Sequence, residues 1–97
     1  MFTMHFTKSA LQDLAFLRKS DQQTVIAESE RQLKHEPTKE TRNRKPLRPN
    51  DLSQWELRVG DFRVFYDVDL EEEETLIKAV GEKEHNKLYI RGKEYEL

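Results

Sequence analysis

The chain has 97 residues, of which 35% are hydrophobic and 37% are charged, and its formal net charge is −2. This length predicts a single domain spanning residues 1–97. The absence of cysteine excludes disulfide bonds, cysteine-ligated zinc and a cysteine nucleophile. No apolar run approaches the ~20 residues that a membrane span requires, and the first residues do not resemble a secretory signal. The sequence therefore predicts a cytoplasmic protein that does not associate with a membrane.

Two helices are predicted after a short first strand. Residues 2–6 alternate apolar and polar side chains, which is typical of a strand with one buried face. Thr7 is a suitable N-cap for a helix over about residues 8–19. Ser20 begins a capping-box pattern for a second helix, which must end before Pro37. Because the joint between the two helices is very short, we expect them to form an antiparallel hairpin.

A long basic loop is predicted over residues 37–53, which contain all three prolines of the chain. A loop of this length in a small domain is usually functional or mobile. Its basic residues are Lys39, Arg42, Arg44, Lys45 and Arg48. Although the whole chain is mildly acidic, such a local concentration of cations is what a phosphate backbone would encounter.

Three further strands are predicted in the second half of the chain, at about residues 54–60, 62–69 and 75–81. Gly60 supplies the turn between the first two. Along these two strands, one set of alternating side chains is mainly apolar, and the other set includes Glu56, Arg58 and Arg63. The apolar set is expected to face the helices, which leaves the charged set on the opposite face of the sheet.

In the last of these strands, Leu76, Lys78 and Val80 are expected to alternate with Ile77 and Ala79. Both sets are fairly apolar, which is typical of a central strand that is buried on both faces.

A short helix is predicted over residues 84–91, because acidic residues lie at its start and basic residues at its end. Gly92 is a suitable C-terminal stop for that helix. The element order is then β-α-α-β-β-β-α. It predicts an α+β fold with a twisted antiparallel sheet of about four strands, and with the N-terminal helical hairpin packed on one face. The other face is expected to be free and to display Arg58 and Arg63.

Two stretches carry a family resemblance: Trp-Glu-Leu-Arg-Val-Gly-Asp-Phe-Arg-Val-Phe-Tyr at residues 55–66, and Ala-Val-Gly-Glu-Lys-Glu-His-Asn-Lys-Leu-Tyr at residues 79–89. Together with the strand, helical hairpin and basic loop before them, they resemble the RelE/ParE toxin superfamily of bacterial and archaeal toxin–antitoxin pairs. The resemblance covers nearly the whole chain and implies a twisted sheet on a helical hairpin. RelE-like members are ribosome-dependent endoribonucleases that cut messenger RNA, whereas ParE-like members inhibit DNA gyrase and have no RNase site.

The RelE-like branch is the favoured prediction, and the resemblance places its functional residues by position. The catalytic candidates are Glu56, Arg63, Lys83, His85 and Tyr89. The RNA-binding candidates are Arg44, Lys45, Arg48 and Arg58. The resemblance implies no cofactor, and the sequence offers no convincing set of metal ligands.

Cleavage of RNA by its own 2′-hydroxyl needs a base, cations around the pentavalent phosphate, and an acid for the leaving 5′-oxygen. The planar guanidinium of Arg63 can grip two phosphate oxygens. His85 is the residue type best suited to proton transfer near neutral pH. Glu56 is a candidate for the base, and Tyr89 can stack on a splayed base of the RNA.

Other interpretations stay open at this point. From composition alone, Arg58 and Arg63 are more readily interpreted as a solvated sheet face paired with Glu56 and Asp61. Gyrase inhibition without a nuclease site is a second possible function, and a non-toxic binding relative of the fold is a third. The resemblance implies a cognate antitoxin as partner, together with mRNA and the ribosome for an mRNA-cleaving toxin. DNA binding by the toxin–antitoxin complex, through the antitoxin, is a further expectation.

Overall fold

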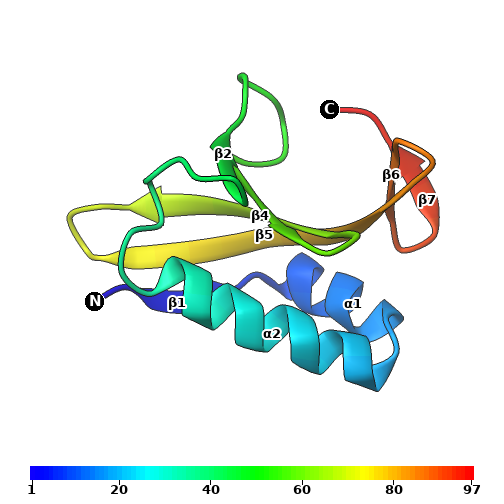
Figure 1. The fold of residues 1–97 in the computed structure, drawn as a ribbon, viewed down its shortest axis with the longest axis horizontal. Coiled ribbons are helices and arrows are strands. Elements are labelled where there is room, and N and C mark those ends of the chain that lie inside the picture. The colour runs from blue at the N-terminus through cyan, green and yellow to red at the C-terminus, as the bar shows by residue number, and fades with distance from the viewer.

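The computed structural model describes residues 1–97, which form two helices and seven strands (Figure 1). The elements are β1 (Thr3–Phe6), α1 (Lys8–Phe16), α2 (Lys19–Leu33), β2 (Arg44–Pro46), β3 (Trp55–Val59), β4 (Phe62–Asp69), β5 (Glu74–Glu84), β6 (Lys87–Ile90) and β7 (Lys93–Tyr95). The predicted α+β class, with a mainly antiparallel sheet and a helical hairpin, is confirmed. The sheet has seven strands instead of about four. Neither helix has the length and apolar character that crossing a membrane would require.

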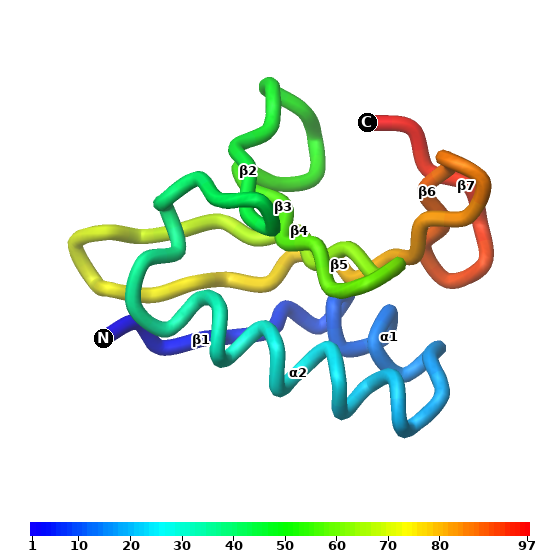
Figure 2. Tube along the Cα trace, viewed as in Figure 1, coloured from blue at the N-terminus to red at the C-terminus, as the bar shows by residue number.

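The eleven-residue strand β5 organises the sheet. It pairs antiparallel with β4 along nearly its whole length. Near its start it pairs in parallel with β1, and near its end it pairs antiparallel with β6. The strand order is β2-β3-β4-β5-β6-β7, with β1 joined to β5 outside that path. The chain trace therefore places β1 towards one end of β5 and the β6–β7 hairpin at the other (Figure 2).

The main hydrophobic core lies between the helices and one face of the sheet (Figure 1). From β3 and β4 it takes Leu57, Val59, Val64 and Tyr66, as the predicted alternation requires. From the helices it takes Ala10, Leu14, Val25 and Leu33. The rings of Trp55 and Tyr66 stack with centroids 6.2 Å apart, and the Tyr66 hydroxyl donates a 2.7 Å hydrogen bond to the carbonyl of Pro37.

The predicted alternation along β5 is wrong because the strand contains a β-bulge. Phe65 pairs with Ala79, but the next residue, Tyr66, pairs with Ile77, so Lys78 has no direct partner on β4. One extra residue in a strand shifts every later side chain to the opposite face. As a result Ile77 and Val80 both lie in the main core, and Ala79 lies on the other face of the sheet.

A second, smaller core covers part of the face that was expected to be free. Its buried members are Phe65, Ala79 and Leu88, and Leu47, Leu52, Ile90 and Tyr95 pack against them. Phe65 and Ala79 belong to β4 and β5. The other side chains come from the β2–β3 connection and from the C-terminal hairpin, which both lie on the side of β4 and β5 away from the helices (Figure 1). The expectation of a fully open face is therefore wrong for the middle of the sheet.

Both helices are shorter than predicted. Thr7 is the N-cap of α1, and its side chain accepts a hydrogen bond from the Ala10 amide, which confirms that prediction. The predicted cap at Ser20 is wrong, because Arg18 is the N-cap of α2 and Ser20 already lies inside the helix. The chain turns between the helices at Leu17 and Arg18, which both have extended backbone angles.

The predicted C-terminal helix is wrong, since residues 84–91 contain a hairpin turn followed by β6. His85 and Asn86 both adopt positive φ angles, of 52° and 68°. Arg91 and Gly92 do the same, with φ of 50° and 77°. Two successive residues with positive φ form the two-residue turn that best matches the twist of a β-hairpin. The two turns produce the β5–β6 and β6–β7 hairpins.

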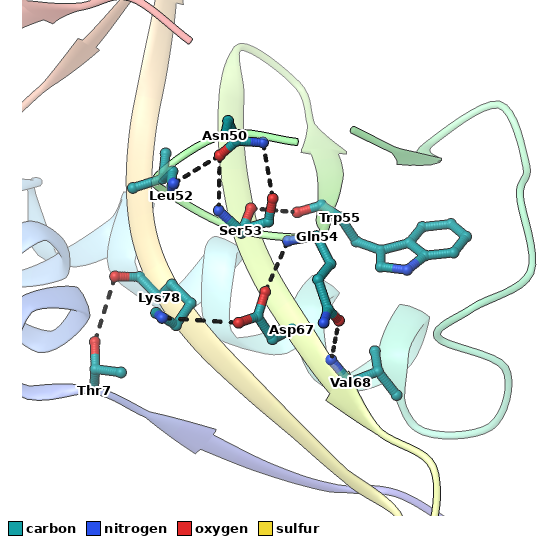
Figure 3. Close-up of polar contacts among 9 residues, drawn as sticks. All are labelled: Thr7, Asn50, Leu52, Ser53, Gln54, Trp55, Asp67, Val68 and Lys78. Carbon is teal, nitrogen blue, oxygen red and sulfur yellow. Dashed lines mark hydrogen bonds and ion pairs between the residues drawn. The ribbon is translucent and has the colours of Figure 1, made fainter. Parts of the chain in front are cut away.

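The segment predicted as one long loop contains a short strand and many side-chain hydrogen bonds. Arg44 to Pro46 form β2, which pairs with β3. Beyond β2, Asn50 Oδ1 accepts hydrogen bonds from the amides of Leu52 and Ser53 (Figure 3). Gln54 continues this network, because its amide donates to Asp67 and its side-chain oxygen accepts from the Val68 amide (Figure 3).

Replacing Gly81 with alanine is expected to lower the free energy of unfolding by about 1–3 kcal/mol. A Cβ atom at this position would lie 2.8 Å from the carbonyl oxygen of Tyr89 and 2.9 Å from a methyl group of Leu88. The substitution should also speed amide exchange in β6, which hydrogen-exchange mass spectrometry would measure. Gly60→Ala is the control. Its Cβ meets no atom within 4 Å, so it should cost only the strain of φ +57° and leave β6 exchange unchanged.

Candidate functional site

The β3–β4 hairpin brings Arg58 and Arg63 together as directly paired residues on the face away from the helices. Arg58 is exposed, whereas Arg63 is only 8% exposed. Nη1 of Arg63 donates 2.9 Å hydrogen bonds to the carbonyls of Gly60 and Phe62. The backbone of its own turn therefore fixes the guanidinium. Like charges directly opposite one another weaken a strand pair, so this arrangement is not explained by sheet stability alone.

Burial is the main influence on the ionisation of Arg63 and lowers its pKa. Glu56 and Asp61 act in the opposite direction, and the neighbouring Arg58 lowers the pKa of Arg63 further. An arginine begins from so high a pKa that the side chain still carries its charge at neutral pH. The result is a cation that is fixed, partly desolvated and only partly neutralised, which is the state best suited to binding an anion.

Glu56 lies on the same face as Arg58 and is 6% exposed. Its carboxylate is 3.7 Å from Nζ of Lys45, the residue that pairs with it across β2 and β3. Burying a carboxylate removes its hydration, and a nearby cation offsets part of that cost. Glu56 therefore sits between Lys45 on one side and the arginines on the other, an arrangement that suits a counter-ion at least as well as a proton acceptor.

Lys83 extends the same face on β5. Arg63 pairs with Gly81, and Lys83 lies two residues further along, so its side chain leaves the same side of the sheet. The Lys83 amide also donates a 2.7 Å hydrogen bond to the carbonyl of Asp61 in the β3–β4 turn. We define the cationic cluster as Lys45, Arg58, Arg63 and Lys83, with Glu56 among them.

The structure does not bring Tyr89 to this cluster. Tyr89 pairs with Glu82, which in turn pairs with Phe62, a residue of the helix-facing side. Tyr89 accordingly lines a depression together with Leu17 and Val80 on that side. His85 is exposed in the β5–β6 turn, two residues beyond Lys83. The predicted catalytic residues therefore do not form one cluster. Glu56, Arg63 and Lys83 lie on the face away from the helices. Tyr89 lies on the helix-facing side, and His85 lies in the β5–β6 turn.

The two predicted RNA-binding arginines of the long loop have different surroundings. Arg44 pairs with Leu57, and its guanidinium turns towards α2, where Nη1 donates to the carbonyl of Gln32. Nε of Arg44 donates to the carbonyl of Lys39 at 3.1 Å. These bonds hold the loop to the end of the helix. Arg48 is exposed in the β2–β3 connection, where its carbonyl accepts a hydrogen bond from Asn50.

Sequence reasoning missed an ion pair that joins α1 to the C-terminal hairpin, between a buried aspartate and an exposed arginine. Asp13 is 2% exposed, and its Oδ2 accepts a 3.1 Å hydrogen bond from the amide of Val80. Oδ1 lies 2.8 Å from Nε of Arg91, in an ion pair without good hydrogen-bond alignment. The signal was present in the sequence, because Asp13 occupies the helical spacing of the buried Ala10 and Leu14.

Burial raises the pKa of Asp13, and the Val80 amide and Arg91 offset this only in part. A raised pKa means that the native state binds the proton more tightly than the unfolded state. The stability contributed in this way is complete below the ordinary aspartate pKa and is lost as pH rises through the raised value. We expect the unfolding free energy of the parent, relative to that of Asp13→Asn, to decrease as pH rises from the ordinary aspartate pKa through the raised one. Urea titrations at stepped pH would measure this difference. A constant difference would contradict this assignment.

No set of three or more histidine, aspartate or glutamate side chains lies close enough together to hold a metal ion. The side chains of the cationic cluster supply fixed positive charge, and the Glu56 carboxylate lies among them. Such a surface can bind the phosphate groups of a nucleic acid.

Comparison with known proteins defines the class of protein to which this fold belongs. A solved structure of the toxin–antitoxin complex RelBE2 from Mycobacterium tuberculosis is similar, with a TM-score of 0.73, 29% identity, and 84% of this chain and 98% of that chain covered. The archaeal RelE–RelB complex from Pyrococcus horikoshii OT3 has a TM-score of 0.65 and 22% identity over 81% and 91% of the two chains. The isolated RelE toxin from E. coli has the same TM-score and 20% identity over 88% and 87%. The fold is therefore that of the RelE/ParE superfamily.

A sequence model of the ParE toxin of type II toxin–antitoxin systems, parDE, matches residues 4–86. The chain belongs to this family of toxins. No curated protein sequence matches the chain.

Proposed function

We propose that this toxin inhibits translation by cleaving messenger RNA on the ribosome, through attack of the RNA 2′-hydroxyl and without a metal ion. The observation that carries the proposal is the cationic cluster around Arg63. Its guanidinium is fixed in advance by two backbone carbonyls. Fixed donors of this kind stabilise charge that develops in a transition state, because they need no rearrangement when the reaction occurs.

The cluster suggests a division of roles at the scissile phosphate. Arg63 binds the non-bridging oxygens, while Arg58 and Lys83 add positive charge as the pentavalent phosphate forms. Glu56 holds Lys45 and the arginines in place or accepts the 2′-hydroxyl proton. His85, on the exposed turn beyond Lys83, donates a proton to the leaving 5′-oxygen.

Tyr89 and the loop arginines have more distant roles in this proposal. RNA that follows the cluster would reach Tyr89 only by bending around the β5–β6 turn, where the ring could stack on an unpaired base. Arg48 extends the positive surface, and Arg44 supports it by fixing the loop that carries Lys45.

The proposed partner is a cognate antitoxin that binds this chain and neutralises it. Support comes from the similar structures: the one from Mycobacterium tuberculosis is named a toxin–antitoxin complex, and the one from Pyrococcus horikoshii OT3 is named a RelE–RelB complex. The toxin would act in the cytoplasm, where ribosomes are found, and DNA binding by the toxin–antitoxin complex would occur through the antitoxin.

Induced expression of the chain without an antitoxin tests the proposal. Growth and translation should stop, and primer extension should show new 5′ ends within ribosome-bound messages. Intact messages during growth arrest would contradict mRNA cleavage. Normal growth with abundant folded protein would instead indicate a non-toxic relative of the fold.

Inhibition of DNA gyrase is the second candidate function. Two observations favour it: the matching family is described by its ParE member, and Tyr89 lies on the opposite face from Arg63. A ParE-like toxin would induce the DNA-damage response and leave mRNA intact. Supercoiling by purified gyrase in the presence of the toxin separates the two functions directly.

A further inference from the structure

A cavity of about 520 Å³ lies between α1, β5 and the C-terminal hairpin, and we call it the hairpin cavity. Its apolar lining comes from Ala79 of β5, Ile90 of β6, Tyr95 of β7 and Leu52 of the β2–β3 connection. All four residues are part of the second core or pack against it, and all except Ala79 are only half-buried. The volume is in the range of small-ligand sites, and apolar surface inside it stays accessible.

The hairpin cavity lies next to the cationic cluster. Gly81 pairs with Arg63 on β4, and Ala79 lies two residues before Gly81 on β5. Residues two apart in a strand share a face of the sheet and are separated by about 7 Å. A strand of RNA held by the cluster can therefore place an adjacent nucleotide in the cavity without leaving this face.

Tyr95 supplies an aromatic ring on the face of the cluster, which Tyr89 does not. Tyr95 pairs with Leu88, and Leu88 pairs with Lys83, so these three side chains share one face. Two strand spacings, roughly 10 Å, separate Tyr95 from Lys83. The ring is half-buried against the second core, which leaves part of it available for stacking on a base.

Charge also favours the hairpin cavity over the depression around Tyr89. Three acidic residues and a single basic one line that depression. The hairpin cavity is instead lined by two acidic residues and by three basic ones, which are Lys78, Arg91 and Lys93. Lys78 already lies 3.7 Å from Asp67 in an ion pair, so the exposed Lys93 is the more available cation. A phosphate backbone is repelled by the first surface and attracted by the second.

Arg91 is the residue of the cavity best suited to recognise a base. Its Nε lies 2.8 Å from Oδ1 of the buried Asp13, and its Nη1 donates a 3.2 Å hydrogen bond to Oε1 of Gln12. These contacts fix the guanidinium and leave its other N–H groups available. A guanidinium can donate two hydrogen bonds to O6 and N7 of guanine, whereas adenine presents a donor in place of O6.

We propose that the hairpin cavity binds a guanine base of the RNA, next to the phosphate held by Arg63. Tyr95 stacks on the base, Arg91 binds its O6 and N7, and Lys93 contacts a neighbouring phosphate. Cleavage would then depend on a guanine beside the cut. The inference rests on the proposed cleavage of mRNA, and it assigns to that reaction a site that determines its sequence preference.

Titration of the parent chain with guanosine 5′-monophosphate, followed by NMR, tests the cavity without ribosomes. The amides of Ala79, Ile90 and Tyr95 should shift, and adenosine 5′-monophosphate should bind about tenfold more weakly. Inorganic phosphate alone should leave these amides unshifted. Absence of shifts with guanosine 5′-monophosphate would overturn the cavity as a site. Shifts that phosphate alone reproduces would overturn a base site, and equal affinity for the two nucleotides would overturn the recognition of guanine.

Two pairs of variants test the assigned residues. Tyr95→Leu should weaken nucleotide binding about tenfold, whereas Tyr95→Phe retains the ring and should bind like the parent. Arg91→Gln should shift the preference from guanine towards adenine, because a glutamine side chain pairs with N6 and N7 of adenine. Its control is Arg31→Gln, at an exposed arginine of α2 that is also paired with a carboxylate, and it should keep the preference for guanine. This readout is a ratio of two affinities, so partial unfolding of a variant does not change it. An Arg91→Gln variant that keeps the parent's preference would overturn the role of Arg91.

Cleavage of messages on purified ribosomes connects the cavity with the reaction. The parent should cut mainly beside guanine, and Arg91→Gln should cut with its preference shifted towards adenine. The same cut sites in the parent and in Arg91→Gln would exclude the cavity from the path of the RNA. Binding of guanosine 5′-monophosphate in the cavity without any cleavage of message would overturn the proposed function and leave the guanine site in place.

Discussion

Replacing Arg63 with alanine is expected to reduce the rate of mRNA cleavage by about 100-fold or more, the usual effect of removing a fixed donor to a transition-state anion. Arg63 is the only cluster member whose guanidinium is held by backbone carbonyls on its own turn. Its loss would leave Arg58 and Lys83 as less fixed charges. The measurement is single-turnover cleavage of message on purified ribosomes by the purified variant.

Two further variants make this result interpretable. Arg18→Ala removes an exposed arginine between the two helices, away from the cluster, and should cleave like the parent. Arg63→Lys keeps the charge but loses the planar fork, so its rate should lie between those of the parent and Arg63→Ala. Arg63 is largely buried, so thermal unfolding must show that each variant is folded. A folded Arg63→Ala that cleaves at the parent rate would remove Arg63 from the site.

Replacing Phe65 with alanine is expected to destabilise the chain by about 3–5 kcal/mol, the usual cost of removing a buried aromatic ring. Phe65 is 0% exposed and centres the second core, where it packs with Ala79 and Leu88. Since small domains are typically stable by only about 5–15 kcal/mol, this loss should be large in urea denaturation. The C-terminal hairpin should also exchange its amides faster.

Leu70→Ala is the matched control for this prediction. Leu70 is 63% exposed in the β4–β5 turn, so its truncation should change stability by no more than about 0.5 kcal/mol. A loss below ~1 kcal/mol for Phe65→Ala would mean that the loop and hairpin on this face contribute little to the fold.

The elements that local periodicity specifies could be predicted from the sequence. The helical spacing in residues 8–33 and the alternation in residues 55–69 each bury one face, so the helical hairpin and the β3–β4 hairpin followed directly. The C-terminal hairpins could not be predicted in the same way. Their two turns use His85 and Arg91 with positive φ, an angle that residues other than glycine seldom adopt, and the charge pattern of this segment equally fits a short helix.

The candidate site could likewise be predicted only where the alternation of side chains along a strand determines the face on which a residue lies. Alternation correctly placed Glu56, Arg58 and Arg63 on one face, because the register of β3 and β4 contains no irregularity there. The position of Tyr89 depended on whether its segment was a helix or a strand, so the error in secondary structure became an error in the grouping of the site. The roles of all these residues remain predictions.

The pairing of β1 with β5 has a consequence for how the chain folds. From β2 to β7, each strand pairs with its neighbour in the sequence, whereas β1 must find Glu74 to Ile77 from the other end of the chain. Closing so long a loop has a large entropic cost before any contact compensates for it. The meander should therefore assemble first and β1 last. Pulse-labelled hydrogen exchange would show β4 amides protected before those of Thr3 and Thr7, and simultaneous protection would exclude this order.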